Sequence, residues 1–265
     1  MSKTRANAIW LYGFTAVACA IIFGTSAGRA DARPIISEDF NRPNNTTMTG
    51  LAPDIANLPG GVFSVSTTFY PMQTHANQLQ IGADISLNVP LGAYDAGLLH
   101  MSADVSLDTL LGSLGGNNRG VGLGFQPTSN GGWTTFTGLK LTPDGYLMLQ
   151  SNQINLGAVF VGTSNSSTYH LSYDVDVGTG VMSAISLQGI SANFSSLVTA
   201  SAGHNYFSGN PYASVFVGGT NAGQIGIIDN FAVSDSIPEP ASSILLGSSI
   251  VGLGVMRRRA RRRAS

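Results

Sequence analysis

Between about residues 35 and 236 the chain alternates short apolar and polar runs, and glycine, asparagine, serine and proline separate these runs. Alternation with a period of two is typical of strands that have one buried and one exposed face. The pattern predicts an all-β domain whose strands are Val62–Tyr70, Gln78–Leu87, Leu98–Leu107, Gly120–Gln126, Trp133–Leu141, Tyr146–Gln150, Ala158–Gly162, Thr168–Val175, Val181–Leu187, Ala213–Val217 and Gly223–Ser234.

Turn signals between these runs favour hairpins. Pro143-Asp144-Gly145 and Gly178-Thr179-Gly180 each separate two predicted strands. Only Asp108–Leu114 looks able to form a short helix, and the glycines after it would end it. Because helical crossovers are lacking, the strands predict one antiparallel β-sandwich of two sheets.

Residues 1–32 have the zones of a secretory signal peptide. Lys3 and Arg5 precede an uncharged apolar run, Ala8 to Phe23, and small residues follow. Ala30-Asp31-Ala32 fits a cleavage site, while a cut after Ala27 and an uncleaved N-terminal anchor remain alternatives. The Sec export machinery and a signal peptidase are the partners expected for this segment.

The last 28 residues contain three features in a fixed order. Pro238, Glu239 and Pro240 come first, and an uncharged segment at 241–256 predicts a transmembrane helix. An arginine block follows at 257–263, and its charges resist passage through the bilayer, which would keep the tail in the cytoplasm. The block consists of Arg257, Arg258, Arg259, Arg261, Arg262 and Arg263.

This order resembles the PEP-CTERM sorting signal of Gram-negative bacteria. The resemblance implies that an exosortase, a membrane protease, recognises Pro238-Glu239-Pro240 and processes the tail while the arginine block holds it. The chain would then comprise a signal peptide (1–32), a β-sandwich (33–237) and a sorting signal (238–265). An ordinary membrane anchor is the alternative, and a glycosylphosphatidylinositol signal fits less well because its tail does not normally end in basic residues.

Charge and cysteine content exclude several classes of function. Residues 33–237 contain four basic and twelve acidic residues, a net charge of −8, which disfavours nucleic acid as a partner. Cys19, the only cysteine, lies in the expected leader. The mature chain would therefore have no disulfide, no cysteine-ligated metal and no cysteine nucleophile.

Five phrases of the body resemble the concanavalin A-like jelly roll of lectin and glucanase modules. In such sandwiches the first and last strands often lie together, so the opening and closing phrases are expected to pair. The phrases are EDFNR at Glu38–Arg42, RGVGLGF at Arg119–Phe125, LTPDGYLML at Leu141–Leu149, HLSYDVDVGTG at His170–Gly180 and IIDNFAVSD at Ile227–Asp235.

A glycan-active hydrolase of this fold needs two carboxylates that flank the scissile bond. The Glu-x-Asp-x-x-Glu pattern of the glucanase branch is absent, and Asp174 with Asp176, on one face of a strand, is the nearest substitute. Asp176 borders a Gly-Thr-Gly turn, where aspartate commonly binds the backbone, so we favour a structural role for it. We therefore expect a protein without enzymatic activity, with the hydrolase as the alternative.

Metal and cofactor sites have little support in the sequence. The four histidines lack the spacing of metal ligands, so no metal is expected at them. Calcium could be held by Asp95, Asp104 and Asp108, but the D-x-[DN]-x-[DN]-G loop is missing. No other cofactor is indicated.

Carbohydrate binding is the remaining expectation. Trp133 beside Gly131-Gly132 could stack on a sugar ring, with Asp174 and Asp176 as candidate hydroxyl-binding groups, although a core position for the tryptophan is favoured. We expect an exported protein, anchored transiently and then released to the cell surface or matrix, where exopolysaccharide is the expected partner. An ice- or surface-binding protein is a further alternative, but the body lacks regular T-x-T ranks.

Overall fold

The computed structural model describes residues 33–236 except 59, 67–71, 83–84, 93–96, 108–119, 133, 164–166, 203–206, 208, 210–211 and 219–224. The predicted signal peptide, the Pro-Glu-Pro motif, the transmembrane segment, the arginine block and the predicted helix at Asp108–Leu114 lie outside the described residues. Of the helices that are described, none has the length and apolar character needed to cross a membrane.

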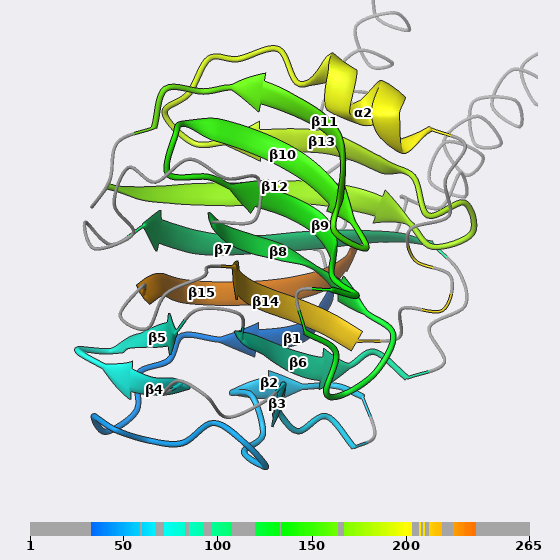
Figure 1. Ribbon diagram of the computed structural model, residues 1–265. Coiled ribbons are helices and arrows are strands. Elements are labelled where there is room, and N and C mark those ends of the chain that lie inside the picture. The colour runs from blue at the N-terminus through cyan, green and yellow to red at the C-terminus, as the bar shows by residue number, and fades with distance from the viewer. Residues whose placement is uncertain are drawn as a thin grey trace, which may run out of the picture. The chain divides into compact units, whose positions relative to one another are not determined.

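Residues Arg33–Ser236 form one compact unit of two antiparallel sheets that lie face to face (Figure 1). Within the described residues, the eight-stranded sheet has the order β13-β12-β7-β15-β1-β2, and β5 joins it through β15 and carries β4. Its strands are β1 (Arg33–Glu38), β2 (Ile55–Ala56), β4 (Met72–His75), β5 (Gln78–Gly82), β7 (Leu98–Leu107), β12 (Thr168–Asp176), β13 (Met182–Leu187) and β15 (Ile225–Ser236).

The seven-stranded sheet has the order β11-β10-β9-β8-β14-β6-β3 in the same part of the chain. The prediction of a two-sheet antiparallel sandwich is thereby confirmed. Its strands are β3 (Ser64–Val65), β6 (Ile85–Pro90), β8 (Gly120–Gln126), β9 (Thr137–Leu141), β10 (Tyr146–Ser151), β11 (Ile154–Phe160) and β14 (Tyr212–Gly218).

The first and last strands of the sandwich pair, as the sequence predicts. β1 runs antiparallel to β15, and Glu38 lies opposite Phe231. A register shift in β15 between Asp229 and Ala232 accommodates Asn230, whose φ of 49° lies in the left-handed region. This bulge turns the following residues back into register, so that Phe231 points into the core.

The core between the sheets comes from alternate residues of the long strands. In β7 the inward positions are Leu99, Met101, Ala103, Val105 and Leu107, all essentially buried. Tyr173 of β12 is also buried, and its hydroxyl donates to the carbonyl oxygen of Leu123 on the opposite sheet at 3.2 Å. Burial raises the pKa of Tyr173, so the neutral phenol acts as the donor that links the two sheets.

The loop between β8 and β9 packs on the outer face of the central strands of the seven-stranded sheet. Ser86 donates to the carbonyl oxygen of Gly131 at 2.5 Å, and the Gln126 amide donates to that of Gly132 at 2.9 Å. The ring of Phe136 stacks on that of Phe216 at 4.8 Å. The central strands of this sheet are therefore buried on both faces, and all seven residues of β8 are buried.

Helix α2 (Ser195–Ser201) corrects the expectation that only Asp108–Leu114 could form a helix. Its N-terminus has no side-chain cap and no acidic residue in the first turn, so the usual start signals are absent. The helix is held by packing instead, because Leu197 is buried in the core and the helix contacts β11.

Candidate functional site

The outer face of the eight-stranded sheet carries the same five-residue motif, His-x-Ser-x-Asp, on two neighbouring strands. His100–Asp104 lies on β7 and His170–Asp174 lies on β12. Because these strands are antiparallel, the motifs run in opposite directions and His100 faces Asp174, Ser102 faces Ser172, and Asp104 faces His170. We call this surface the paired motifs.

Each histidine of the paired motifs forms a short contact with its aspartate. Nδ1 of His100 lies 2.7 Å from Oδ1 of Asp174, and Nδ1 of His170 lies 2.7 Å from Oδ1 of Asp104. Since a carboxylate only accepts hydrogen bonds, Nδ1 of each histidine is the donor in this contact. Both histidine side chains are 39% exposed, so part of each ring is open to solvent.

Asp104 and Asp229 bring negative charge to one end of the paired motifs. These residues lie opposite each other on β7 and β15, and the Asn230 amide donates to Oδ2 of Asp104 at 2.7 Å. Partial burial, and then the charges of Asp104 and Asp39, raise the pKa of Asp229. Asp104, a calcium candidate from the sequence, is thus engaged by His170 and Asn230, whereas Asp95 and Asp108 lie outside the described residues.

The two aspartates proposed from the sequence have different surroundings. Asp174 pairs with His100, whereas Asp176 lies at the end of β12, where its Oδ1 accepts from the backbone and hydroxyl of Thr179 at 2.7 and 2.9 Å. These hydrogen bonds, the backbone one first, lower the pKa of Asp176. Asp176 holds the turn before β13, and Asp174 orients an imidazole, so both carboxylates are engaged within the protein.

The other proposed site residues cannot be placed. Trp133 lies outside the described residues, as do Pro238, Glu239, Pro240 and the arginine block.

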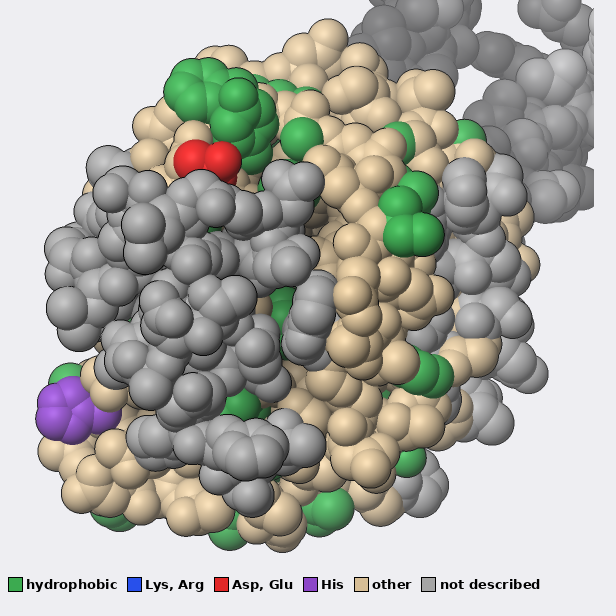
Figure 2. Space-filling view, in the orientation of Figure 1, with side chains coloured by type: hydrophobic (Ala, Val, Ile, Leu, Met, Phe, Trp, Pro, Cys, Tyr) green, Lys and Arg blue, Asp and Glu red, His purple; other side chains and the backbone are tan. Residues whose placement is uncertain are grey.

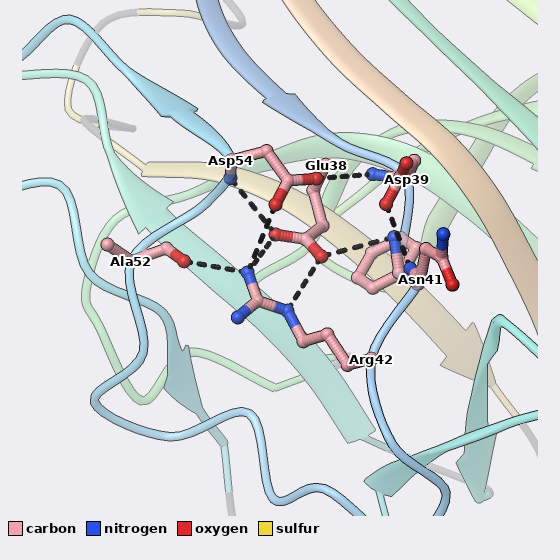
Figure 3. A network of polar contacts seen from close by, with 7 residues as sticks. Glu38, Asp39, Asn41, Arg42, Ala52 and Asp54 are labelled. Atoms are coloured by element: carbon pink, nitrogen blue, oxygen red, sulfur yellow. Dashed lines mark hydrogen bonds and ion pairs between the residues drawn. The ribbon is translucent and has the colours of Figure 1, made fainter.

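A network of one buried and two exposed carboxylates lies at the end of β1 (Figure 3). Glu38, Asp39 and Asp54 have carboxylate oxygens within 4.8 Å of one another, the only such group of three potential metal ligands among the described residues. Arg42 lies among them, with Nε and Nη2 at 2.8 and 2.5 Å from the Glu38 carboxylate and Nη2 at 3.7 Å from Asp54. The guanidinium therefore supplies the positive charge of this cluster, which links β1 to the segment before β2.

An exposed pair of aromatic rings lies at the edge of the seven-stranded sheet. Tyr146 of β10 and Phe160 of β11 are directly opposite, with ring centroids 5.2 Å apart and planes at 66°. Phe160 is 64% exposed and Tyr146 is 38% exposed. Figure 2 shows a group of hydrophobic side chains at this corner of the face, where β10 begins and β11 ends, with acidic side-chain atoms beside it. We call these two rings the aromatic platform.

Two glycines lie beneath the aromatic platform. A Cβ on Gly145 would come within 3.2 Å of the Phe160 ring, and one on Gly162 within 3.6 Å. Both glycines have positive φ, +83° and +64°, a conformation that other residues rarely adopt. The Gly145 carbonyl accepts from the backbone of Val161 and Gly162 at 2.8 and 3.1 Å, so the ring rests on a hydrogen-bonded backbone.

Neither surface was predicted as a site from the sequence. The repeat of His-x-Ser-x-Asp in HMSAD and HLSYD was a signal for the paired motifs, but only the strand register shows that the motifs meet. The aromatic platform has a weaker signal, since Phe160 lies between two valines like a core phenylalanine, and only the strand order shows that β11 is an edge strand.

No protein-family model matches the sequence, and a search of curated proteins finds no match. Among solved structures, domain 4 of the extracellular arabinanase AbnA from Geobacillus stearothermophilus, in complex with arabinotriose, is similar at 14% identity and a TM-score of 0.46. The similarity covers 77% of this chain and 93% of that domain.

Two other similar structures have comparable scores. The botulinum neurotoxin serotype D ligand-binding domain, in complex with N-acetylneuraminic acid, has 12% identity and a TM-score of 0.41, covering 80% of this chain and 49% of that one. The carbohydrate recognition domain of Emp46p has 9% identity and a TM-score of 0.45, covering 74% of this chain and 97% of that one. At these identities and scores the likeness extends to β-sandwich architecture and no further.

Proposed function

We propose that this chain is an exported, non-enzymatic surface or extracellular-matrix protein whose β-sandwich, of the concanavalin A-like jelly-roll type, binds carbohydrate among exopolysaccharide. Its route would be export by the Sec machinery, transient anchoring by 241–256, and processing by an exosortase at Pro238-Glu239-Pro240. The sorting part of the proposal rests on the order of segments along the sequence. A predicted leader precedes the sandwich, and the Pro-Glu-Pro motif, the apolar segment and the arginine block follow it.

The sandwich supports a binding role in two ways. Its net charge of −8 over 33–237 keeps it soluble in a hydrated setting and disfavours polyanionic partners. It also exposes the aromatic platform, and exposed rings are the groups that stack on sugars. The geometry does not support the hydrolase alternative, because neighbouring side chains form hydrogen bonds with both of its candidate carboxylates, Asp174 and Asp176.

The sorting proposal is tested by the mass and location of the protein in its producing cells. We expect the wild type outside the inner membrane with both ends removed. Glu239→Ala, or deletion of 257–263, should leave the tail intact or the protein misplaced, because the protease would lose its recognition residue or the translocation stop. Wild-type mass and surface yield in both variants would refute exosortase sorting.

A further inference from the structure

We infer that the aromatic platform, Tyr146 with Phe160, is the carbohydrate-binding site and that it takes a pyranose ring of a neutral polysaccharide. The inference rests on the proposed function and gives it a location. It differs from the sequence-based candidates, since Trp133 lies outside the described residues and Asp174 lies on the other sheet.

The first argument is that the Phe160 ring is held in place before any ligand arrives. One side of the ring is set by Gly145 and Gly162, and Tyr146 meets it edge to face. The turn beneath is fixed by Thr142, whose hydroxyl accepts from the Tyr146 backbone at 3.0 Å and whose backbone donates to the Tyr146 carbonyl at 2.8 Å. A ring that is already ordered loses little conformational entropy when a sugar stacks on it.

The second argument concerns the chemistry of the exposed surface. The face of an aromatic ring carries a negative electrostatic potential, and it attracts the weakly positive C–H hydrogens on the apolar side of a pyranose. A core role does not account for a phenylalanine that is 64% exposed. The platform covers only two rings, so it suits a single sugar ring better than a protein partner, which needs a much larger buried area.

The third argument comes from the polar groups at the rim of the platform. Asp144, exposed in the turn before Tyr146, can accept hydrogen bonds from sugar hydroxyls. Thr163 follows Gly162, and its backbone nitrogen lies 3.4 Å from the Cβ position of Gly145, next to the platform. The negative charge of Asp144 favours a neutral polymer over an anionic one.

The test is affinity electrophoresis of the protein in the form that its producing cells make. The gels contain hydroxyethyl cellulose, galactomannan or the anionic alginate. We expect retardation of the wild type by a neutral polymer and none by alginate. Phe160→Ala should weaken binding about tenfold or more, because the stacking surface is removed. Phe160→Trp, which keeps an aromatic face, should retain binding.

Two variants control for surface and fold effects. Ile154→Ala removes a side chain of similar exposure (62%) from the same strand, and Asp174→Asn alters the opposite sheet, so both should bind like the wild type. Thermal unfolding of Phe160→Ala should match the wild type, because the side chain is exposed.

The outcomes separate the inference from the proposed function. If the wild type binds a neutral polymer and Phe160→Ala binds equally well, the location is wrong while carbohydrate binding stands. If Asp174→Asn alone abolishes binding, the site lies on the paired motifs and the inference is also wrong. Binding of alginate alone refutes the ligand class, and a wild type that binds none of the polymers refutes carbohydrate binding itself.

Discussion

The carboxylate of Glu38 is completely buried and accepts four hydrogen bonds. Its donors are the backbone of Phe40 and of Asp54, at 3.1 and 3.2 Å, and two nitrogens of Arg42. The carboxylate, through its side-chain hydrogen bond before its charge, raises the pKa of Arg42, so the guanidinium keeps its positive charge. Figure 3 shows how these donors surround the carboxylate from two segments of the chain. The buried carboxylate is tolerated here because four hydrogen-bond donors, two of them on a guanidinium, compensate for the loss of water.

We predict that Glu38→Gln lowers the free energy of unfolding by about 3 kcal/mol, the typical cost of removing one partner from a buried ion pair. The amide would leave Arg42 without its nearest counter-charge and would turn an N–H donor toward other donors. Chemical denaturation measures the loss.

Asp39→Asn is the matched control for Glu38→Gln. Asp39 is exposed, and its carboxylate accepts from the backbone of Asn41 at 2.8 Å, which an amide oxygen can also do. A change within about 0.5 kcal/mol is expected for it. Equal stability of Glu38→Gln and the wild type would show that the network contributes nothing to folding.

Strand β9 shows how a covering element changes the meaning of a sequence pattern. Its sequence TGLKL alternates, which predicts an exposed lysine, yet all five residues are buried. Lys140 lies on the outer face between Gly122 and Met148, and its ammonium donates to the Gln150 side chain at 2.6 Å. Desolvation lowers the pKa of Lys140 from 10.5 to about 8.

Lys140 should therefore make stability depend on alkaline pH. The unfolded chain keeps the lysine proton up to about 10.5 and the folded chain releases it near 8, so wild-type stability rises between these values. Relative to Lys140→Met, the gain should be on the order of 3 kcal/mol. Urea denaturation at pH 7.5, 9 and 10.5 measures the difference between the two proteins. A difference that stays constant over this range would place the pKa of Lys140 at its ordinary value.

Two strands, Leu98–Leu107 and Gly120–Gln126, have the bounds that the sequence predicted. Gln78–Leu87 was wrong as a single strand, because β5 ends at Gly82 and β6 begins at Ile85 in the other sheet. Of the predicted strand Val62–Tyr70, the described residues form a strand only at Ser64–Val65. Alternation of apolar and polar residues could not show where the chain passes from one sheet to the other.

At the scale of the whole molecule, both sheets, including the paired first and last strands β1 and β15, lie within Arg33–Ser236. We predict that a fragment with these residues folds by itself and unfolds cooperatively at the same temperature as the longer chain, because its core is complete. Circular dichroism during heating tests this. A fragment without a cooperative transition would mean that residues outside 33–236 contribute to the core.

The sequence predicted the architecture more fully than the binding surface. Alternation and turn residues are local signals, so they were sufficient for the two-sheet sandwich. The contacts between Phe160 and Gly145 and between His100 and Asp174 join positions that are distant along the chain, and they depend on strand order and register. No local pattern encodes those.

The paired motifs have a consequence for how the central strands align. A slip of one residue between β7 and β12 would turn apolar side chains to solvent, but a slip of two residues keeps every side chain on its own face. Such a slip would set His100 against Ser172 in one direction, and in the other would set His170 against Ser106. Of these three alignments only the native one sets both imidazoles opposite carboxylates, so these polar residues favour the correct pairing over slips that the hydrophobic core alone would accept.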